Sequence, residues 1–255
     1  MPSEVHPTAS EIHSTGERSP GATWQHPGSA RWFLDRRAQR LPLIDVQEDL
    51  VARLFERHGH EVERFLDLGA GDGALSRLML ASFPRAEAIL VDFSEPMLAG
   101  VADTLADRGR WRIVRGDLSM PRWREGIPEG RYGAAVSSLA IHHLPAQRKR
   151  ALYAEVFALL DADAMFVNLD YVRIRGPLQG LWEEQLVENT LRLECDRPGG
   201  RTRAELEEEL LGDADEDRPD TVDEQLQWLR DAGFQDVEVH FKWAEAAIFG
   251  GVRPA

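Results

Sequence analysis

The stretch from Phe65 to Leu78 constrains the fold of this chain more than any other part of the sequence. It opens with Phe65–Leu68, which has the length of one buried strand, and continues with glycines at positions 69, 71 and 73. The apolar residues after the third glycine recur at helical spacing. Glycine lacks a Cβ atom and tolerates positive φ, so such a turn brings backbone N–H groups close to a ligand at a helix N-terminus. The stretch therefore predicts a strand, a tight glycine turn and a helix, in that order.

Strand and helix patterns alternate along most of the remaining chain. Short apolar runs predict strands near residues 64–68, 88–91, 111–114, 132–137, 164–169, 237–241 and 246–252. Helical patterns separate most of these runs, one of them from Pro96 to about Asp107, and Gly233 is expected to end the last helix. Such alternation favours a parallel sheet with helices on both faces. The predicted fold class is α/β, with a Rossmann-like, doubly wound sheet.

Two segments fall outside this alternation. Residues 1–28 are rich in Pro, Ser, Thr, Gly and His and show no periodicity, so we expect a flexible N-terminal segment before one domain over residues 29–255. Residues from about 171 to 220 show no clear strand but contain two amphipathic helical patterns. We expect this insertion to form a helical cap over the sheet.

Composition and charge limit the classes of partner that the chain can bind. The chain of 255 residues has 30 Lys and Arg against 44 Asp and Glu, a net charge of −14. This charge opposes contact with nucleic acid or an anionic membrane. The single cysteine, Cys195, excludes an internal disulfide framework and a cysteine-rich metal site. No apolar run reaches transmembrane length, and residues 1–20 lack the apolar core of a signal peptide. A cytoplasmic protein is expected.

Two classes of ligand suit the glycine turn. Gly69-x-Gly71-x-x-Ala74 satisfies the dinucleotide fingerprint, which keeps NAD and FAD open. Asp67, at the end of the preceding strand, suits a cationic amino group better than a pyrophosphate, which it would repel. Asp92 ends the second strand, where an acidic residue can accept both hydroxyls of a ribose. Asp117 follows the third strand and can accept from an adenine amino group, a feature that NAD enzymes do not require.

The motifs together resemble a known family. Asp67-Leu-Gly-Ala-Gly-Asp-Gly73, Asp92, Gly116-Asp117-Leu118 and Ser137-Ser-Leu-Ala-Ile-His-His-Leu144 occur in the order and spacing of class I S-adenosylmethionine-dependent methyltransferases. The resemblance is to the small-molecule enzymes that carry Ser-x-x-Ile-His-His-Leu, and it covers roughly residues 60–170. It implies S-adenosyl-L-methionine as cofactor and a seven-stranded sheet whose last strand is antiparallel.

The resemblance also implies roles for individual residues. Asp67 would face the methionyl end of the cofactor and Asp92 the ribose, while Met97 would cover the adenine. The end of the fourth strand, with Ser138, would pass beside the methionine moiety. The full implied cofactor-binding set is Asp67, Gly69, Ala70, Gly71, Gly73, Asp92, Phe93, Met97, Asp117, Leu118 and Ser138.

The two adjacent histidines are candidates for the chemistry. His143 matches a position at which related phosphobase methyltransferases pair a catalytic histidine with a tyrosine. The chain has three tyrosines and none lies in the N-terminal segment, so that pair is not expected here, and a structural role for His143 stays open. His142, Tyr171 and Trp182 are candidate substrate-binding residues, although Trp182 also suits core packing. No further ligands lie near the histidine pair, so we expect no metal site.

The sequence therefore predicts transfer of a methyl group to a small molecule by in-line displacement. A general base is required only when the acceptor must lose a proton, and His143 is the candidate. Three alternatives stay open: an NAD- or FAD-dependent oxidoreductase, a non-catalytic S-adenosylmethionine-binding protein, and a carboxy-S-adenosylmethionine synthase. The last rests on Arg40-Leu41-Pro42, which resembles an Arg-x-x-Pro segment but is one residue short.

Overall fold

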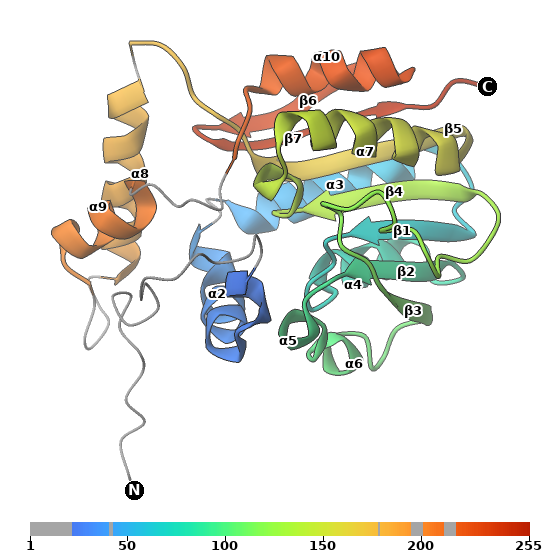
Figure 1. Ribbon diagram of the computed structural model, residues 1–255, viewed down its shortest axis with the longest axis horizontal. Helices are drawn as coiled ribbons and strands as arrows, with labels where there is room; N and C mark the ends of the chain where they lie inside the picture. The colour runs from blue at the N-terminus through green and yellow to red at the C-terminus, as the bar shows by residue number, and fades with distance from the viewer. Residues whose placement is uncertain (1–21, 41–42, 178, 195–200, 212–217) are drawn as a thin grey trace, which may run out of the picture.

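The computed structural model describes residues 22–40, 43–177, 179–194, 201–211 and 218–255. Its centre is one sheet of seven strands (Figure 1). The strands are β1 (Arg64–Leu68), β2 (Glu87–Asp92), β3 (Arg110–Arg115), β4 (Tyr132–Ser138), β5 (Leu160–Tyr171), β6 (Gln235–Trp243) and β7 (Ala246–Val252). Their order across the sheet is β3-β2-β1-β4-β5-β7-β6.

The strand directions confirm the predicted doubly wound topology. Strands β1 to β5 pair in parallel, whereas β7 runs antiparallel to both of its neighbours, β5 and β6. The chain order reverses on either side of β1, which places the carboxyl ends of β1 and β4 at a topological switch point. Ligands of open α/β sheets bind in the crevice at such a point.

Helices cover both faces of the sheet, as expected from the alternation. One face packs against α7 (Ala146–Leu159) and α10 (Val222–Ala232), and the other against α3 (Ile44–His58), α4 (Ala74–Ser82) and α6 (Val101–Thr104). Strand β1 lies between two neighbours and beneath helices on both faces, so Phe65, Leu66 and Leu68 are all buried. This double burial explains why β1 reads as a short apolar run.

The last helix begins and ends as its sequence specifies. Thr221 and Glu224 form a reciprocal capping box at the start of α10. Gly233 ends the helix with a φ of 108°, which confirms the predicted C-cap.

The predicted helix over 96–107 is instead two short helices, α5 (Glu95–Leu98) and α6. The break falls at Ala99 and Gly100. A Cβ atom on Gly100 would lie 3.3 Å from the Cβ of Asp72, so the backbone here packs closely against the glycine turn. The close approach to the turn, together with the low helix propensity of glycine, interrupts the helix.

The segments outside the sheet are helical. The segment after β5 forms α8 (Gln179–Glu194) and α9 (Arg203–Leu211), which stand beside the sheet, as Figure 1 shows. The N-terminal part forms η1 (Ala22–Gln25) and α2 (Pro27–Arg40), and α2 contacts both α5 and α8. The expected domain start at residue 29 thus falls inside α2. Residues 1–21 lie outside the described residues, as do Cys195 and both Leu41 and Pro42 of the Arg40-Leu41-Pro42 segment.

Candidate functional site

The glycine turn after β1 has the backbone geometry that only glycine adopts easily. Gly69, Gly71 and Gly73 have φ values of 70°, 56° and 83°. The N–H groups of Gly69 and Ala70 donate to the carbonyl of Val91 at 2.8 and 3.1 Å, which ties the turn to the end of β2. A Cβ atom on Gly69 would lie 2.1 Å from the Cβ of Ala140, so the turn also packs directly against the segment after β4.

Asp67 lies beneath this turn near the end of β1. Its side chain is almost fully buried, with 1% of the residue exposed, and its Oδ2 accepts from the hydroxyl of Ser76 at 2.6 Å. Ser137 is paired with Leu68, so Ser138 is the β4 residue beside Gly69. The Ser138 hydroxyl is buried and has no hydrogen-bond partner among the described residues. A carboxylate and an unsatisfied hydroxyl therefore flank the turn.

Asp92, at the end of β2, holds the glycine turn itself. Its Oδ2 accepts from the N–H of Gly71 at 2.9 Å, and its Oδ1 accepts from the N–H of Ser94 at 2.8 Å. Burial raises the pKa of the Asp92 carboxyl above its usual value, while the backbone N–H donors oppose this shift. The sequence pattern selected Asp92 as a ligand group but did not reveal this structural role.

The turns after β2 and β3 lie side by side, because the N–H of Gly116 donates to the carbonyl of Asp92 at 3.1 Å. Met97 is buried in α5, and its N–H donates to the hydroxyl of Ser94, the N-cap residue. Asp117 Oδ1 accepts from the N–H of Ser119 at 2.8 Å. Phe93, Met97, Asp117 and Leu118 therefore lie on the segments that follow β2 and β3, next to the glycine turn.

The Leu118 backbone is held by a side chain of α7. The Nε of Arg148 donates to the Leu118 carbonyl at 2.7 Å, and its two terminal nitrogens bind the carboxylate of Glu155 at 2.9 and 2.7 Å. Glu155 also accepts from the indole N–H of Trp123. Arg148 of α7 thus holds the loop after β3.

The histidine pair lies at the other end of the turn, in η2 (Ile141–His143). His142 is 3% exposed; its N–H donates to Oδ2 of Asp170 at 2.9 Å, and its Nδ1 lies 2.5 Å from Oδ1 of the same carboxylate. The His142 ring lies 3.9 Å from the His143 ring and 5.3 Å from the Tyr171 ring, measured between centroids. The structure therefore places the rings of His142, His143 and Tyr171 next to one another.

Asp170 is the residue of this cluster that sequence reasoning missed. It is fully buried near the end of β5 and also accepts from the side chain of Asn168 at 3.2 Å and from the N–H of Tyr171 at 3.0 Å. A carboxylate at the carboxyl end of a parallel strand was a detectable signal, of the same kind that selected Asp92.

The N-terminal segment reaches this edge of the sheet. The hydroxyl of Ser94 donates to the carbonyl of Trp24, and the amide of Gln25 donates to the carbonyl of Phe93 at 3.0 Å. The Trp24 ring lies 5.4 Å from the His143 ring. Trp24 and Gln25 were not selected from the sequence because they fall in a segment without periodicity. Trp182, a predicted substrate residue, lies partly buried on α8.

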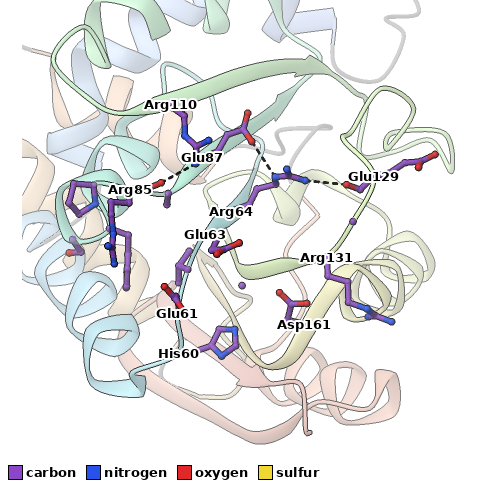
Figure 2. A pocket seen from close by; sticks show the side chains of 17 residues that line it. His60, Glu61, Glu63, Arg64, Arg85, Glu87, Arg110, Glu129, Arg131 and Asp161 are labelled. Atoms are coloured by element: carbon purple, nitrogen blue, oxygen red, sulfur yellow. Dashed lines mark hydrogen bonds and ion pairs between the residues drawn. The ribbon is translucent and has the colours of Figure 1, made fainter.

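A hollow of about 920 Å³ lies at the opposite edge of the sheet, where the parallel strands begin. Figure 2 shows the residues that line it. Charged side chains line it and pair within it: Arg64 binds Glu87 at 3.2 Å and the carbonyl of Glu129 at 3.2 Å. None of the predicted site residues lies there. No group of three or more His, Cys, Asp or Glu among the described residues could hold a metal ion, and no described helix is long and apolar enough to cross a membrane.

Comparison with known sequences points to one class of domain. Residues 65–163 match the family model described as "Methyltransferase domain". The curated relative pyochelin synthetase PchF of Pseudomonas aeruginosa is 27% identical over 192 residues, which cover 71% of this chain and 10% of that protein. Malonyl-[acyl-carrier protein] O-methyltransferase of Legionella pneumophila is 33% identical over 76 residues, 29% of this chain and 27% of the enzyme. The chain thus matches about a tenth of the length of pyochelin synthetase.

Comparison with solved structures shows the fold. An O-methyltransferase family protein from Burkholderia thailandensis superposes with a TM-score of 0.66 at 14% identity, over 97% of this chain and 67% of that one. Human N-acetylserotonin methyltransferase in complex with SAM gives 0.62 at 16% identity, over 95% and 61%. The Rossmann-like sheet with its antiparallel β7 is therefore shared with solved methyltransferases.

Proposed function

We propose that this chain is a class I S-adenosylmethionine-dependent methyltransferase that acts on a small-molecule acceptor by in-line displacement. The observation that carries the proposal is the glycine turn with buried Asp67 on one side and Asp92 on the other, within a segment that matches the methyltransferase domain model. A carboxylate lies at the end of β1, at the end of β2 and in the turn after β3. This series favours S-adenosylmethionine over a dinucleotide as the cofactor.

The residues at the methionyl end suit a cation with polar neighbours. Asp67 is a buried carboxylate and can attract the ammonium group of the cofactor. The buried hydroxyl of Ser138 has no partner among the described residues, so a polar group of the cofactor would satisfy it. A Cβ atom at Gly71 would lie 3.0 Å from Cε of Met97, so a side chain at this position would crowd Met97.

The residues at the nucleoside end suit a ribose and an adenine. Asp92 already accepts one backbone N–H on each oxygen, and each carboxylate oxygen retains a lone pair for a ribose hydroxyl. Phe93 and Met97 offer apolar contacts. Asp117 and the backbone of Leu118 offer an acceptor and a donor to the adenine edge.

The acceptor end is formed by the cluster on η2 and β5. Bound S-adenosylmethionine supplies a sulfonium methyl group as the electrophile. The protein must orient the acceptor and exclude water, which is where most of the rate enhancement arises in such a displacement. Asp170 fixes the imidazole of His142, and Tyr171 with His142 forms an aromatic wall for the acceptor.

His143 is the candidate proton acceptor. Its ring stacks near the fixed ring of His142 and beside Trp24, and it is less buried than His142. For a hydroxyl or amine acceptor, His143 would take the proton at a ring nitrogen as the methyl group is transferred. The O-methyltransferases among the similar proteins favour an oxygen atom as the acceptor.

Binding of S-adenosylhomocysteine, measured by isothermal titration, tests the proposal. We expect the wild-type protein to bind, Asp67→Ala and Gly71→Val to abolish binding, and His143→Ala to bind normally. Asp49→Ala, an exposed carboxylate paired with Arg53 on α3, serves as the matched control. Absence of wild-type binding, or an equal loss in all three site variants, would refute the assignment. Binding of NAD instead would revive the oxidoreductase alternative.

A further inference from the structure

The short helix η1 is fastened to the loop after β2. The Ser94 hydroxyl donates to the carbonyl of Trp24, and the side chain of the next residue, Gln25, donates to the carbonyl of Phe93. These bonds join residues about 70 positions apart, and they restrain the backbone directly at Trp24. The position of the Trp24 ring is therefore set by the same loop that follows Asp92.

Trp24 connects the two ends of the proposed site. Its backbone is held at the nucleoside end, whereas its ring lies 5.4 Å from His143 and 5.3 Å, edge to face, from Phe33 of α2. His143 lies beside His142 in the acceptor cluster. In Figure 1, α2 stands between the α8–α9 pair and the edge of the sheet where α5 lies. Trp24 thus covers the acceptor cluster from the N-terminal side.

The indole N–H of Trp24 is buried and has no hydrogen-bond partner among the described residues. Buried tryptophan N–H groups usually find an acceptor, because desolvating a donor without replacing its hydrogen bond is unfavourable. Trp123 follows the rule in this chain, since its indole N–H donates to Glu155. The unsatisfied donor of Trp24 therefore indicates a partner outside the described residues.

We propose that the Trp24 indole N–H donates a hydrogen bond to an oxygen atom of the methyl acceptor. Indole nitrogen only donates, so the acceptor molecule must present a carbonyl, carboxylate or phenolic oxygen at this point. The ring lies beside His143 of the acceptor cluster, which favours the acceptor molecule over the cofactor as the partner of the indole N–H. This inference rests on the proposed function and narrows its substrate class to oxygen-bearing acceptors.

The test uses protein saturated with S-adenosylhomocysteine and three probes, namely phenol, benzoate and salicylate, at millimolar concentration. The indole N–H signals of the seven tryptophans are followed by NMR in the wild-type protein. Trp24→Phe identifies the Trp24 signal, and this change removes the donor while it retains an aromatic ring. Trp243→Phe, at an exposed position at the end of β6, is the control.

We expect at least one oxygen-bearing probe to shift the Trp24 signal. Trp24→Phe should weaken that probe about tenfold, the size of one hydrogen bond, while the affinity for S-adenosylhomocysteine stays within about twofold. Ser94→Ala, which frees the Trp24 carbonyl, should weaken the same probe in the same direction.

Three outcomes would overturn the inference. They are equal probe affinity in the wild-type and Trp24→Phe proteins, binding of none of the three probes, and a loss of S-adenosylhomocysteine affinity in Trp24→Phe, which would assign the donor to the cofactor. Failure of the wild-type protein to bind S-adenosylhomocysteine is a separate result, and it would refute the proposed function instead.

Discussion

Replacing Gly69 by alanine tests how tightly the glycine turn is held against the segment after β4. Gly69 has a φ of 70°, and an added Cβ atom would lie 2.1 Å from the Cβ of Ala140. The left-handed conformation costs a non-glycine residue about 1–2 kcal/mol. Overpacking of a filled interior adds about 1–3 kcal/mol. We therefore expect Gly69→Ala to lower the free energy of unfolding by about 2–5 kcal/mol.

Gly59 provides a matched control for the backbone contribution. It ends α3 with a φ of 75°, close to that of Gly69, but the nearest heavy atom to an added Cβ lies 4.0 Å away. Gly59→Ala should therefore cost only the conformational part, about 1–2 kcal/mol. The difference between the two variants measures the steric contact alone.

A second substitution separates the contact from other effects. Ala140→Gly removes the atom at 2.1 Å, and the next atoms, at 3.6 and 3.9 Å, are at ordinary contact distance. In urea denaturation, Ala140→Gly should therefore recover about 1–3 kcal/mol in the Gly69→Ala background and nothing in the Gly59→Ala background. Equal costs for Gly59→Ala and Gly69→Ala, or no recovery in the double variant, would refute the reasoning.

Two further predictions concern buried charges. Lys149 is fully buried and pairs with Asp220 at 2.7 Å, so Lys149→Met should lower the free energy of unfolding by about 3–5 kcal/mol. Arg203 forms an exposed pair with Glu188, so Arg203→Met should lower it by less than about 1 kcal/mol. Comparable losses in urea denaturation would contradict this. Burial raises the pKa of the Asp92 carboxyl in the folded protein above its ordinary value of 3.8. Between the pKa values of the unfolded and folded states, the folded state holds more protons than the unfolded state, so stability falls as pH rises. Asp92→Asn should abolish this part of the fall, so that its stability relative to wild type rises as the pH increases above about 4; a pH-independent difference would exclude it.

The sheet was predictable because its strands are buried on both faces. Strand β1 was predicted at its observed bounds, and β7 likewise, because most of their residues are apolar and buried. The edge strand β3 was predicted two residues short, and its side chains are mostly exposed. An exposed edge strand has a weaker apolar pattern, so its ends are less visible in the sequence.

The interactions that assemble the site are long-range, and local patterns do not encode them. Trp24 was assigned to a flexible segment, yet its backbone is fixed by Ser94, 70 positions away. Asp170 was not among the predicted site residues, yet it binds His142, 28 positions away. Periodicity reports the face of an element and carries no information on such a partner.

The carboxylates at the strand ends form hydrogen bonds within the protein itself. Asp92 accepts from two backbone N–H groups and so fixes the glycine turn, Asp67 accepts from Ser76 of α4, and Asp170 fixes His142. Groups held in this way lose little freedom when a ligand arrives, which is what orientation of reacting groups requires. The buried Trp24 N–H and the buried Ser138 hydroxyl have no hydrogen-bond partner among the described residues. In the site that we propose, the acids define the shape, and the Trp24 N–H and the Ser138 hydroxyl are the groups that we expect to contact a bound molecule.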